Sequence, residues 1–493
     1  MPKARKTATA PRLRVMVELA VKRDTPRERA FETARALASA GLDVDLEYGP
    51  VRLRPPQPER ERLESAGLQL VLVRGTIDPA RKPELDKHPA AYRVWIDTPL
   101  RPFARSLRPA RARPSAPRSR GYRRRQAARQ PTEKPGASPR PARGQAKAAV
   151  GAGLAGPVNC GTTGAVGTIA TALTALGVTR IWKRGHRGRG VQIGVVDGGI
   201  TAFGRPVNPP EVAVIDRVVD GWPTATWGTT ALGWGPNNAQ HGNMVAHDIL
   251  AVAPQAQLWD IRIWQDMPGS TPAEKFAVYV SNAIAAYEFS IARFTAGGVP
   301  QILTNSWGLY DSANDPDFAS DPRSPFALMV QEALDAGMLV LFAAGNCGTG
   351  CPHPTGSPCG ATDRGPGHSI LGPNGHPDVM TVGGADTNGQ WYGFTSQGPA
   401  VLPPNAAKPD FCSITQFAGF FPVHGTKPFD GGTSTACATA AGVVVLLKGY
   451  RPSLTQAQAK TALMSTARNI RAPGFDADSG AGIIRAYTAF GVV

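Results

Sequence analysis

Cysteines, charged residues and long hydrophobic runs are all scarce in this sequence. Its 493 residues include six cysteines, too few for a fold held together mainly by disulfides. No uninterrupted run of about 18 apolar residues occurs, so we expect no membrane span and no membrane partner. The basic N-terminus is not followed by an apolar segment and a small-residue cleavage site, so no secretory signal is predicted. We therefore expect a cytoplasmic protein, with secretion by a non-standard route left open.

Three of the cysteines lie close together, at Cys347, Cys351 and Cys359. Their spacing is not a usual zinc pattern, and only His353 or His368 lies nearby as a fourth ligand. We favour a loop with packed thiols or one local disulfide, with a metal site as the less favoured alternative. No metal ligand and no required cofactor are predicted.

The net charge of +17 raises the question of nucleic-acid binding. Residues 104–147 contain fourteen Lys or Arg and one acidic residue, so this segment accounts for 13 of the 17 positive charges and leaves +4 elsewhere. Beyond Phe103 its one aromatic residue is Tyr122, so the stacking side chains of a single-strand binder are missing. We expect a solvated linker and no nucleic-acid partner, with nucleic-acid association through this segment as an alternative.

Composition divides the chain into four parts. Residues 1–11 and the Arg/Pro-rich linker 104–157 are expected to be disordered. Residues 12–103 mix strand and helix signals, which predicts a small α+β domain. Residues 158–493 form the main domain. In the small domain the predicted strands are Arg14–Ala20, Val44–Leu53, Leu68–Gly75 and Tyr92–Asp97, and the predicted helices are Thr25–Ala40 and Pro58–Ala66.

The main domain alternates apolar strands with helices. Strands that read as continuous apolar runs indicate a mostly parallel sheet covered by helices on both faces, which is a three-layer α/β fold. The predicted strands are Val191–Val196, Leu258–Ile263, Gln301–Ser306, Met338–Ala343 and Val379–Gly384, and the predicted helices are His241–Val252, Pro272–Phe294, one around Phe326–Leu334, and Ser434–Leu447.

Three polar residues lie where this architecture places reactive groups. Asp197 follows the strand Val191–Val196, while His241 and Ser434 each open a helix. A serine hydroxyl needs an adjacent base to act as a nucleophile, and a histidine oriented by a buried carboxylate supplies one. We therefore expect Asp197, His241 and Ser434 to form a catalytic triad.

A fourth polar residue follows the strand Met338–Ala343. The side chain of Asn346 is placed to donate a hydrogen bond to the oxyanion of a tetrahedral intermediate. The backbone N–H of Ser434, at a helix N-terminus, would be the second donor.

These segments together resemble the subtilisin-like serine peptidases, the subtilases. The resemblance covers about Val178 to Val493 and implies endoproteolysis through an acyl-enzyme on a parallel α/β fold. It also implies that Ser306, Trp307 and Gly308 pair with the backbone of a protein or peptide substrate, and that Ala344 and Gly345 line the pocket beside the scissile bond. The segments that carry it are Val195–Ile200, His241–Ala246, Asn305–Gly308, Ala343–Asn346, Phe394–Pro399, Lys408–Asp410, Gly432–Ala436 and Gly480–Gly482.

The resemblance leaves several points open. Where the family usually has His-Gly-Thr-His, this chain has His241, Gly242, Asn243 and Met244, which puts the loop geometry in question. An inactive relative that only binds peptides is the alternative to an active enzyme. Many subtilases carry a small α+β propeptide, so residues 12–103 are either a self-cleaved inhibitory propeptide or a domain of another kind. Structural calcium is common in the family, but no acidic cluster here has a spacing that identifies a site.

Overall fold

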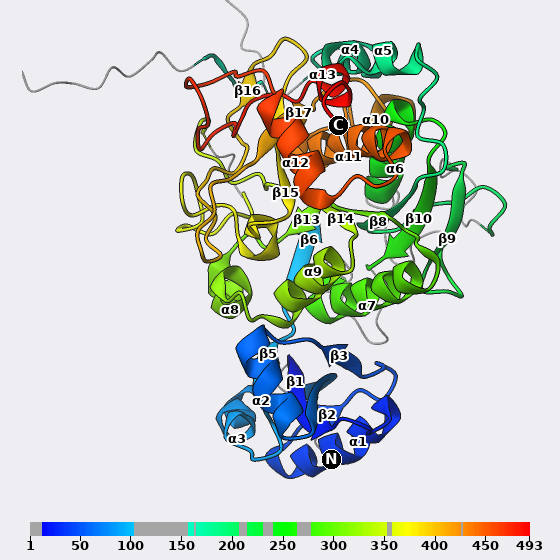
Figure 1. The fold of residues 1–493 in the computed structure, drawn as a ribbon. Coiled ribbons are helices and arrows are strands. Elements are labelled where there is room, and N and C mark those ends of the chain that lie inside the picture. The colour runs from blue at the N-terminus through cyan, green and yellow to red at the C-terminus, as the bar shows by residue number, and fades with distance from the viewer. Residues whose placement is uncertain are drawn as a thin grey trace, which may run out of the picture.

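The computed structural model describes residues 12–102, 156–161, 164–206, 214–229, 240–263, 278–352, 357–424 and 427–493. The segments predicted to be disordered, 1–11 and 104–157, lie outside these residues except for 156 and 157. A small N-terminal unit lies against one side of a larger body, below helices α7 and α9 (Figure 1). Strand β6 (Pro99–Pro102) leaves this unit and enters the larger body (Figure 1).

The N-terminal unit is an antiparallel sheet, and the helical segments over residues 30–40 and 82–86 pack on one of its faces. The strand order is β2-β4-β1-β5, and β3 also pairs with β4. Side chains alternate along β1, so Val15 and Val17 enter the core under the unit's own helices while Met16 enters the core shared with the larger body. The elements are β1 (Leu13–Lys22), η1 (Arg27–Arg29), α1 (Ala30–Arg35), η2 (Ala36–Ala40), β2 (Asp43–Val44), β3 (Val51–Leu53), α2 (Gln57–Ser65), β4 (Leu68–Ile77), η3 (Pro79–Arg81), α3 (Lys82–Asp86) and β5 (Arg93–Ile96).

Two predicted elements of this unit differ in the structure. The single strand predicted over Val44–Leu53 is wrong, because residues 45–50 form a turn between β2 and β3. The turn contains Gly49 and Pro50, and proline has no backbone N–H for a ladder hydrogen bond. The helix predicted over Thr25–Ala40 is three short pieces, two of them 3₁₀. Strand β6 and helix α3 were not predicted.

The larger body is built on a nine-stranded sheet. Its order is β7-β16-β15-β14-β12-β8-β10-β9, with β17 also paired to β15. The central strands from β15 to β9 are all parallel to their neighbours. The strands are β7 (Val158–Asn159), β8 (Gln192–Asp197), β9 (Val218–Trp222), β10 (Gln257–Arg262), β12 (Ile302–Asn305), β14 (Leu339–Ala343), β15 (Met380–Ala385), β16 (Trp391–Tyr392) and β17 (Phe411–Ile414).

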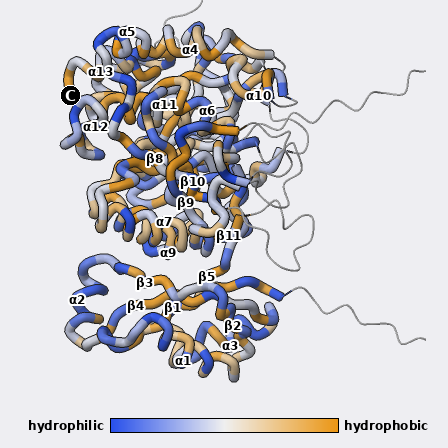
Figure 2. Tube along the Cα trace, turned by 90° about the vertical axis from the view of Figure 1, so that its right-hand side faces the viewer, coloured by the Kyte–Doolittle hydropathy of each residue, from blue (hydrophilic) through white to orange (hydrophobic). Residues whose placement is uncertain are grey.

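Helices cover both faces of this sheet, as predicted. Along β14, Leu339 and Leu341 enter one core and Val340 and Phe342 the other. Figure 2 shows the apolar strands β8 and β10 between α6 and α11 on one side and α7 and α9 on the other. The first face carries α4 (Ile169–Leu176), α5 (Val178–Trp182), α6 (His241–Val252), α11 (Gly432–Tyr450), α12 (Gln456–Ser465) and α13 (Ala486–Phe490), and the second carries α7 (Val280–Gly297) and α9 (Pro325–Asp335).

Helix α11 is unusually long and apolar. Among the described residues it is the one helix long and apolar enough to cross a membrane, but 89% of that stretch is buried inside the body. It packs against α6 and the strands β15, β17 and β14. Its hydrophobicity is therefore that of a core helix.

Short elements complete the body and correct one predicted boundary. The helix predicted from Pro272 begins at Val280, because Val278 and Tyr279 form strand β11 against β6. Residues 264–277 lie outside the described residues. The remaining elements are β11 (Val278–Tyr279), β13 (Trp307–Gly308), η5 (Ser312–Asn314), α8 (Pro316–Ser320), η6 (Gly372–Gly375) and α10 (Phe421–His424).

Candidate active site

Asp197 is the last residue of β8, a central strand of the sheet. Its side chain is buried, and one carboxylate oxygen, Oδ1, accepts a hydrogen bond from the backbone N–H of Gly198 at 2.6 Å. In a parallel sheet the crevice beyond the strands' carboxyl ends is where ligands bind. Strand β8 therefore holds the Asp197 carboxylate at the edge of the sheet where a catalytic site is expected.

His241 begins α6 and lies directly against this carboxylate. Its Nδ1 is 2.8 Å from Asp197 Oδ1 and 3.0 Å from Oδ2. The next residue must be glycine, because a Cβ on Gly242 would lie 2.3 Å from the carbonyl oxygen of Gly199. This close approach brings the start of α6 against the loop that follows Asp197.

The side chain of Asn243 also bonds to the loop that follows Asp197. Its Oδ1 accepts a hydrogen bond from the backbone N–H of Thr201 at 2.8 Å, and its Nδ2 donates to Thr201 Oγ1 at 2.7 Å. Asn243, which stands where the family usually has threonine, thus makes two hydrogen bonds between α6 and the loop after β8. A single sequence gave no signal for this role.

Ser434 is the third residue of α11 and completes a hydrogen-bonded row. Its Oγ is 3.1 Å from His241 Nε2 and also donates to the carbonyl oxygen of Ser306 at 3.1 Å. All three side chains of the row are buried. The structure therefore brings together Asp197, His241 and Ser434, which are separated by up to 237 positions in the sequence, in a carboxylate–imidazole–hydroxyl arrangement.

Asn346 lies beside Ser434 with its amide held in one orientation. Its Oδ1 accepts hydrogen bonds from Thr433 N and Thr433 Oγ1, both at 3.0 Å. Thr433 Oγ1 is also within 3.1 Å of the Gly345 backbone nitrogen. The residue before Ser434 thus positions both Gly345 and Asn346, two of the predicted site residues.

The segment predicted to pair with substrate does form a strand, β13, next to Ser306. Its partner is β6 of the same chain, with Trp307 opposite Pro102 and Gly308 opposite Arg101. On its other side β6 pairs with β11, which makes a three-stranded sheet in the order β11-β6-β13. The indole N–H of Trp307 donates to the carbonyl oxygen of Val196 at 2.8 Å, which ties β13 to β8.

Comparison with known proteins gives the family. The model of the subtilase family of peptidases matches residues 188–482, which is more than half of the chain. The chain belongs to the subtilase family. This membership places it among the serine endopeptidases and confirms the resemblance drawn from the sequence motifs.

The named relatives that this chain matches share only a small part of its sequence. Mycosin-1 of Mycobacterium tuberculosis is 27% identical over 333 residues, covering 61% of this chain and 69% of the relative. Mycosin-1 of Mycolicibacterium smegmatis is 35% identical over 160 residues, which are 30% of this chain and 34% of the relative. Subtilisin DY of Bacillus licheniformis is 24% identical over 306 residues, which are 59% of this chain and 88% of the relative.

A solved structure supports the fold. The crystal structure of fervidolysin from Fervidobacterium pennivorans, described as a keratinolytic enzyme related to subtilisin, matches with a TM-score of 0.53 at 16% identity. The match covers 98% of this chain and 61% of the fervidolysin chain. This chain therefore spans less than two thirds of that protein's length, and the likeness shows the subtilisin-like fold alone.

The N-terminal unit of this subtilase contacts the peptidase body at the N-termini of helices α7 and α8. Asp97 accepts hydrogen bonds from Ser281 N and Ser281 Oγ, both at 2.9 Å, at the first turn of α7. Tyr48 Oη donates to the carbonyl oxygen of Ser281 at 3.0 Å. Thr98 donates a short hydrogen bond to Asp315, just before α8. A carboxylate at a helix N-terminus satisfies otherwise unpaired backbone N–H groups and stabilises the helix end.

A buried ion-pair network joins the two parts. Arg323 of the peptidase body donates to both oxygens of Glu18, at 2.9 and 2.8 Å, and to both oxygens of Glu59, at 2.6 and 2.9 Å. Trp95 Nε1 adds a bond to Glu18 at 2.8 Å. Burial raises the pKa of Glu18, although the bonds from Arg323 act in the opposite direction. Arg323 therefore supplies a bidentate positive partner to each of two buried carboxylates of the N-terminal unit.

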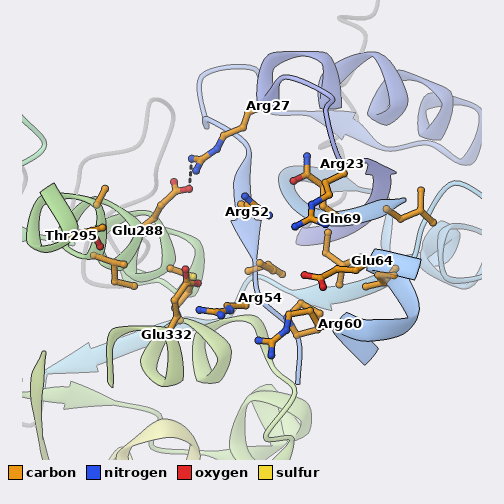
Figure 3. Close-up of a pocket in the computed structure, with 18 of the residues that line it drawn as sticks. Arg23, Arg27, Arg52, Arg54, Arg60, Glu64, Gln69, Glu288, Thr295 and Glu332 are labelled. Carbon is orange, nitrogen blue, oxygen red and sulfur yellow. Dashed lines mark hydrogen bonds and ion pairs between the residues drawn. The ribbon is translucent and has the colours of Figure 1, made fainter. Parts of the chain in front are cut away.

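A cavity of about 580 Å³ opens beside this interface and is not lined by any triad residue. Figure 3 shows basic side chains of the N-terminal unit on one side of it and the carboxylates of Glu288 (α7) and Glu332 (α9) on the other. Arg27 and Glu288 form an ion pair across the cavity. The edge of the docked interface is thus held by opposite charges. The basic residues in its lining are Arg23, Arg27, Arg52, Arg54 and Arg60.

The clustered cysteines are in disulfides. The predicted local disulfide is confirmed as Cys347–Cys359, which starts one residue after Asn346. Cys351 is bonded to Cys160, 191 residues earlier, which was not predicted. The alternative of a metal site at these cysteines is wrong, because all three are used in disulfides. Both bridges restrain the loop that follows the oxyanion candidate Asn346.

Proposed function

We propose that this subtilase is a serine endopeptidase in which Ser434 is the nucleophile, His241 the general base and Asp197 the carboxylate that orients the base. The observation that carries the proposal is the buried row Asp197–His241–Ser434, with 2.8 Å at its first contact and 3.1 Å at its second. His241 takes the proton of Ser434 as Oγ attacks the scissile carbonyl, and then gives it to the leaving amine. Asp197 stabilises the imidazolium that forms between these steps.

The remaining site residues take positioning and electrostatic roles in this proposal. The side chain of Asn346 and the backbone N–H of Ser434 donate to the oxyanion of the tetrahedral intermediate. Trp307 and Gly308 pair with an extended peptide substrate, a position that β6 occupies in this structure. Ala344 and Gly345 line the pocket for the residue before the scissile bond. Every step uses groups of this chain, so a cofactor is not required.

A fluorophosphonate probe tests this function. Ser434 should be labelled covalently in the folded wild type, because its Oγ is within hydrogen-bond distance of His241. Labelling is measured by intact mass, and a digest locates the adduct. A Ser434→Ala variant of equal thermal stability should show no labelling and no peptide hydrolysis. Folded wild type that neither reacts nor hydrolyses a peptide library would establish the alternative, an inactive peptide-binding relative.

The first substrate in this proposal is the chain itself. Strand β6 lies along β13 and runs toward Ser306, whose carbonyl oxygen accepts the hydrogen bond of Ser434 Oγ. Pro102, the last residue of β6, is opposite Trp307, so β6 ends one position short of Ser306. Continuing this register by one residue would bring Phe103 to Ser306, and the bond proposed to be cleaved is therefore Phe103–Ala104. The N-terminal unit thus acts as an inhibitory propeptide that holds β6 in the substrate position.

Intact mass spectrometry of two proteins tests the self-cleavage. The wild type should yield a fragment ending at Phe103 and a mature form beginning at Ala104, while Ser434→Ala should stay full length. Cleavage within a single molecule predicts a rate that does not depend on protein concentration. An active wild type that keeps an intact bond after Phe103 would show that maturation is not the role of β6.

The two disulfides bear on where the enzyme works. Disulfides persist in oxidising compartments and are rare in the cytosol. They favour the export route that the N-terminal sequence left open over the cytoplasmic location expected first. The proposal is therefore a peptidase that acts outside the reducing cytosol on protein or peptide substrates.

A further inference from the structure

Three metal-ligating side chains gather at a place that the proposed reaction does not use. His247 and Asp248 lie on α6, and Asp430 lies just before α11. One potential ligand atom from each falls within 4.8 Å of the other two. Asp248 and Asp430 are fully buried, whereas the side chain of His247 is 34% exposed. The group therefore has a buried acidic end and an opening to solvent at the histidine.

The acidic end of this cluster lacks a positive partner of its own. Asp248 Oδ2 is buried without a hydrogen-bond partner, and its Oδ1 is 3.2 Å from His247 Nδ1. Asp430 accepts the backbone N–H groups of Phe420 and Phe421, at 2.5 and 2.7 Å. Burying an unpaired carboxylate costs free energy, so we expect these side chains to bind either a proton or a cation.

Burial and the closeness of the two carboxyl groups raise the pKa values of these aspartates. Burial, with the Asp248 carboxyl as the next cause, raises the pKa of Asp430 to about 8. Burial also raises the pKa of Asp248 well above its usual value. Lys427 interacts with Asp430, but burial lowers the pKa of this lysine. The ligand atoms of these two buried carboxylates lie within 4.8 Å of each other, so one divalent ion bound between them would offset both charges.

We propose that His247, Asp248 and Asp430 bind a divalent transition-metal ion of the Zn²⁺ type. One imidazole nitrogen and two carboxylates suit zinc, which accepts nitrogen and oxygen ligands in a four-coordinate site with water as the fourth. Ca²⁺ prefers six to eight oxygen ligands, so the histidine and the small donor number disfavour it. The ion would balance the negative charges of Asp248 and Asp430.

The site joins the two elements that carry the proposed base and nucleophile. His247 is six residues after His241 on α6, and Asp430 is four residues before Ser434. A second link runs beside it, from Gln240 Nε2 to the carbonyl oxygen of His424 at 2.8 Å. A bound ion would therefore fix α6 to the turn that leads into α11, and we expect it to raise thermal stability.

Cobalt substitution tests the site in the full-length chain. Ser434→Ala protein, which prevents self-cleavage, is treated with a chelator and titrated with Co²⁺. The expected result is one equivalent bound, with the intense visible absorption of four-coordinate cobalt, displaced by one equivalent of Zn²⁺ but not by millimolar Ca²⁺. The ion should also raise the Tm by several degrees, since it binds the folded state. Because the readout is spectroscopic, it does not depend on the proposed peptidase activity.

Three variants in the same background assign the ligands. His247→Gln and Asp430→Asn should each weaken Co²⁺ binding by 100-fold or more and remove the visible band. His424→Gln, on the neighbouring α10 and outside the cluster, should bind as the parent does. His247 is partly exposed, so its variant keeps the test valid where an aspartate variant fails to fold. Absence of stoichiometric binding would mean that the carboxylates share only a proton, and equal loss in His424→Gln would place the ion elsewhere; either result overturns the proposal.

Discussion

An Asp197→Asn variant should fold normally and lose about 10⁴-fold in kcat, the loss known for the corresponding change in a serine protease of another fold. In the structure Asp197 Oδ1 accepts the N–H of Gly198 at 2.6 Å. The amide oxygen of asparagine would keep that bond and stay 2.8 Å from His241 Nδ1, and the NH₂ group would take the place of Oδ2, 3.0 Å from Nδ1. The NH₂ group favours the tautomer in which His241 accepts at Nδ1 and carries its proton on Nε2, and the negative charge that stabilises the imidazolium is lost. In that tautomer it cannot take the proton of Ser434.

The measurement is steady-state hydrolysis of a peptide by wild type and variant, both compared after removal of residues 1–103. KM should change little, because Asp197 is not part of the strand that pairs with substrate. Asp260→Asn on the neighbouring strand β10 is the control. That carboxyl is also buried, and burial raises its pKa to about 7, but its oxygens accept the backbone N–H groups of Ile200 and Gly228. A loss in Asp197→Asn no greater than in Asp260→Asn would contradict the assigned role of Asp197.

The sheet and its reactive ends were predictable because they depend on local pattern. Strands such as β14 are continuous apolar runs, and α6 was predicted with the bounds that the structure has, His241–Val252. Parallel strands bring their carboxyl ends to one edge, so the sequence alone predicts that Asp197 and Asn346 lie near each other. The row of hydrogen bonds through His241 follows from that arrangement.

The features that the sequence did not predict depend on partners far along the chain. Strand β6 begins and ends with a proline, and its register comes from β13 about 200 residues later. Cys351 finds its partner 191 residues away, and Asp430 faces Asp248 from another element. No periodicity marks such pairs in a single sequence, because tertiary contacts alone bring them together. Strand β11 shows the same effect on a boundary, since Val278 and Tyr279, which were predicted to be helical, pair with β6 instead.

An Arg323→Met variant should release the N-terminal unit from the peptidase body. Removing one partner of a buried ion pair costs about 3–5 kcal/mol, because the other charge stays buried and unpaired. Glu18 is fully buried and has Arg323 as its bidentate partner. Since burial already raises the pKa of Glu18, it can take up a proton in the variant, and we expect the lower end of the range. About 3 kcal/mol corresponds to a more than 100-fold increase in the undocked population.

Amide hydrogen exchange in the full-length Ser434→Ala background measures this change. The amides of Leu100 and Arg101 in β6 should exchange more than 100-fold faster in Arg323→Met, because undocking exposes them. Arg81→Met is the matched control. Arg81 pairs with Glu84 on the surface of the same unit, and such an exposed pair contributes about 0–1 kcal/mol.

The position of the fastest change separates undocking from unfolding of the unit. Undocking accelerates exchange in β6 and at Ser281, whose N–H is bonded to Asp97, and leaves the paired strands β1 and β4 protected. Loss of protection in β1 and β4 as well would show that Arg323 supports the fold of the unit itself. Exchange at Leu100 within about threefold of the parent would rule out Arg323 as a main contact. In the active background the undocked population predicts earlier peptidase activity, because β6 then leaves the substrate strand β13 accessible.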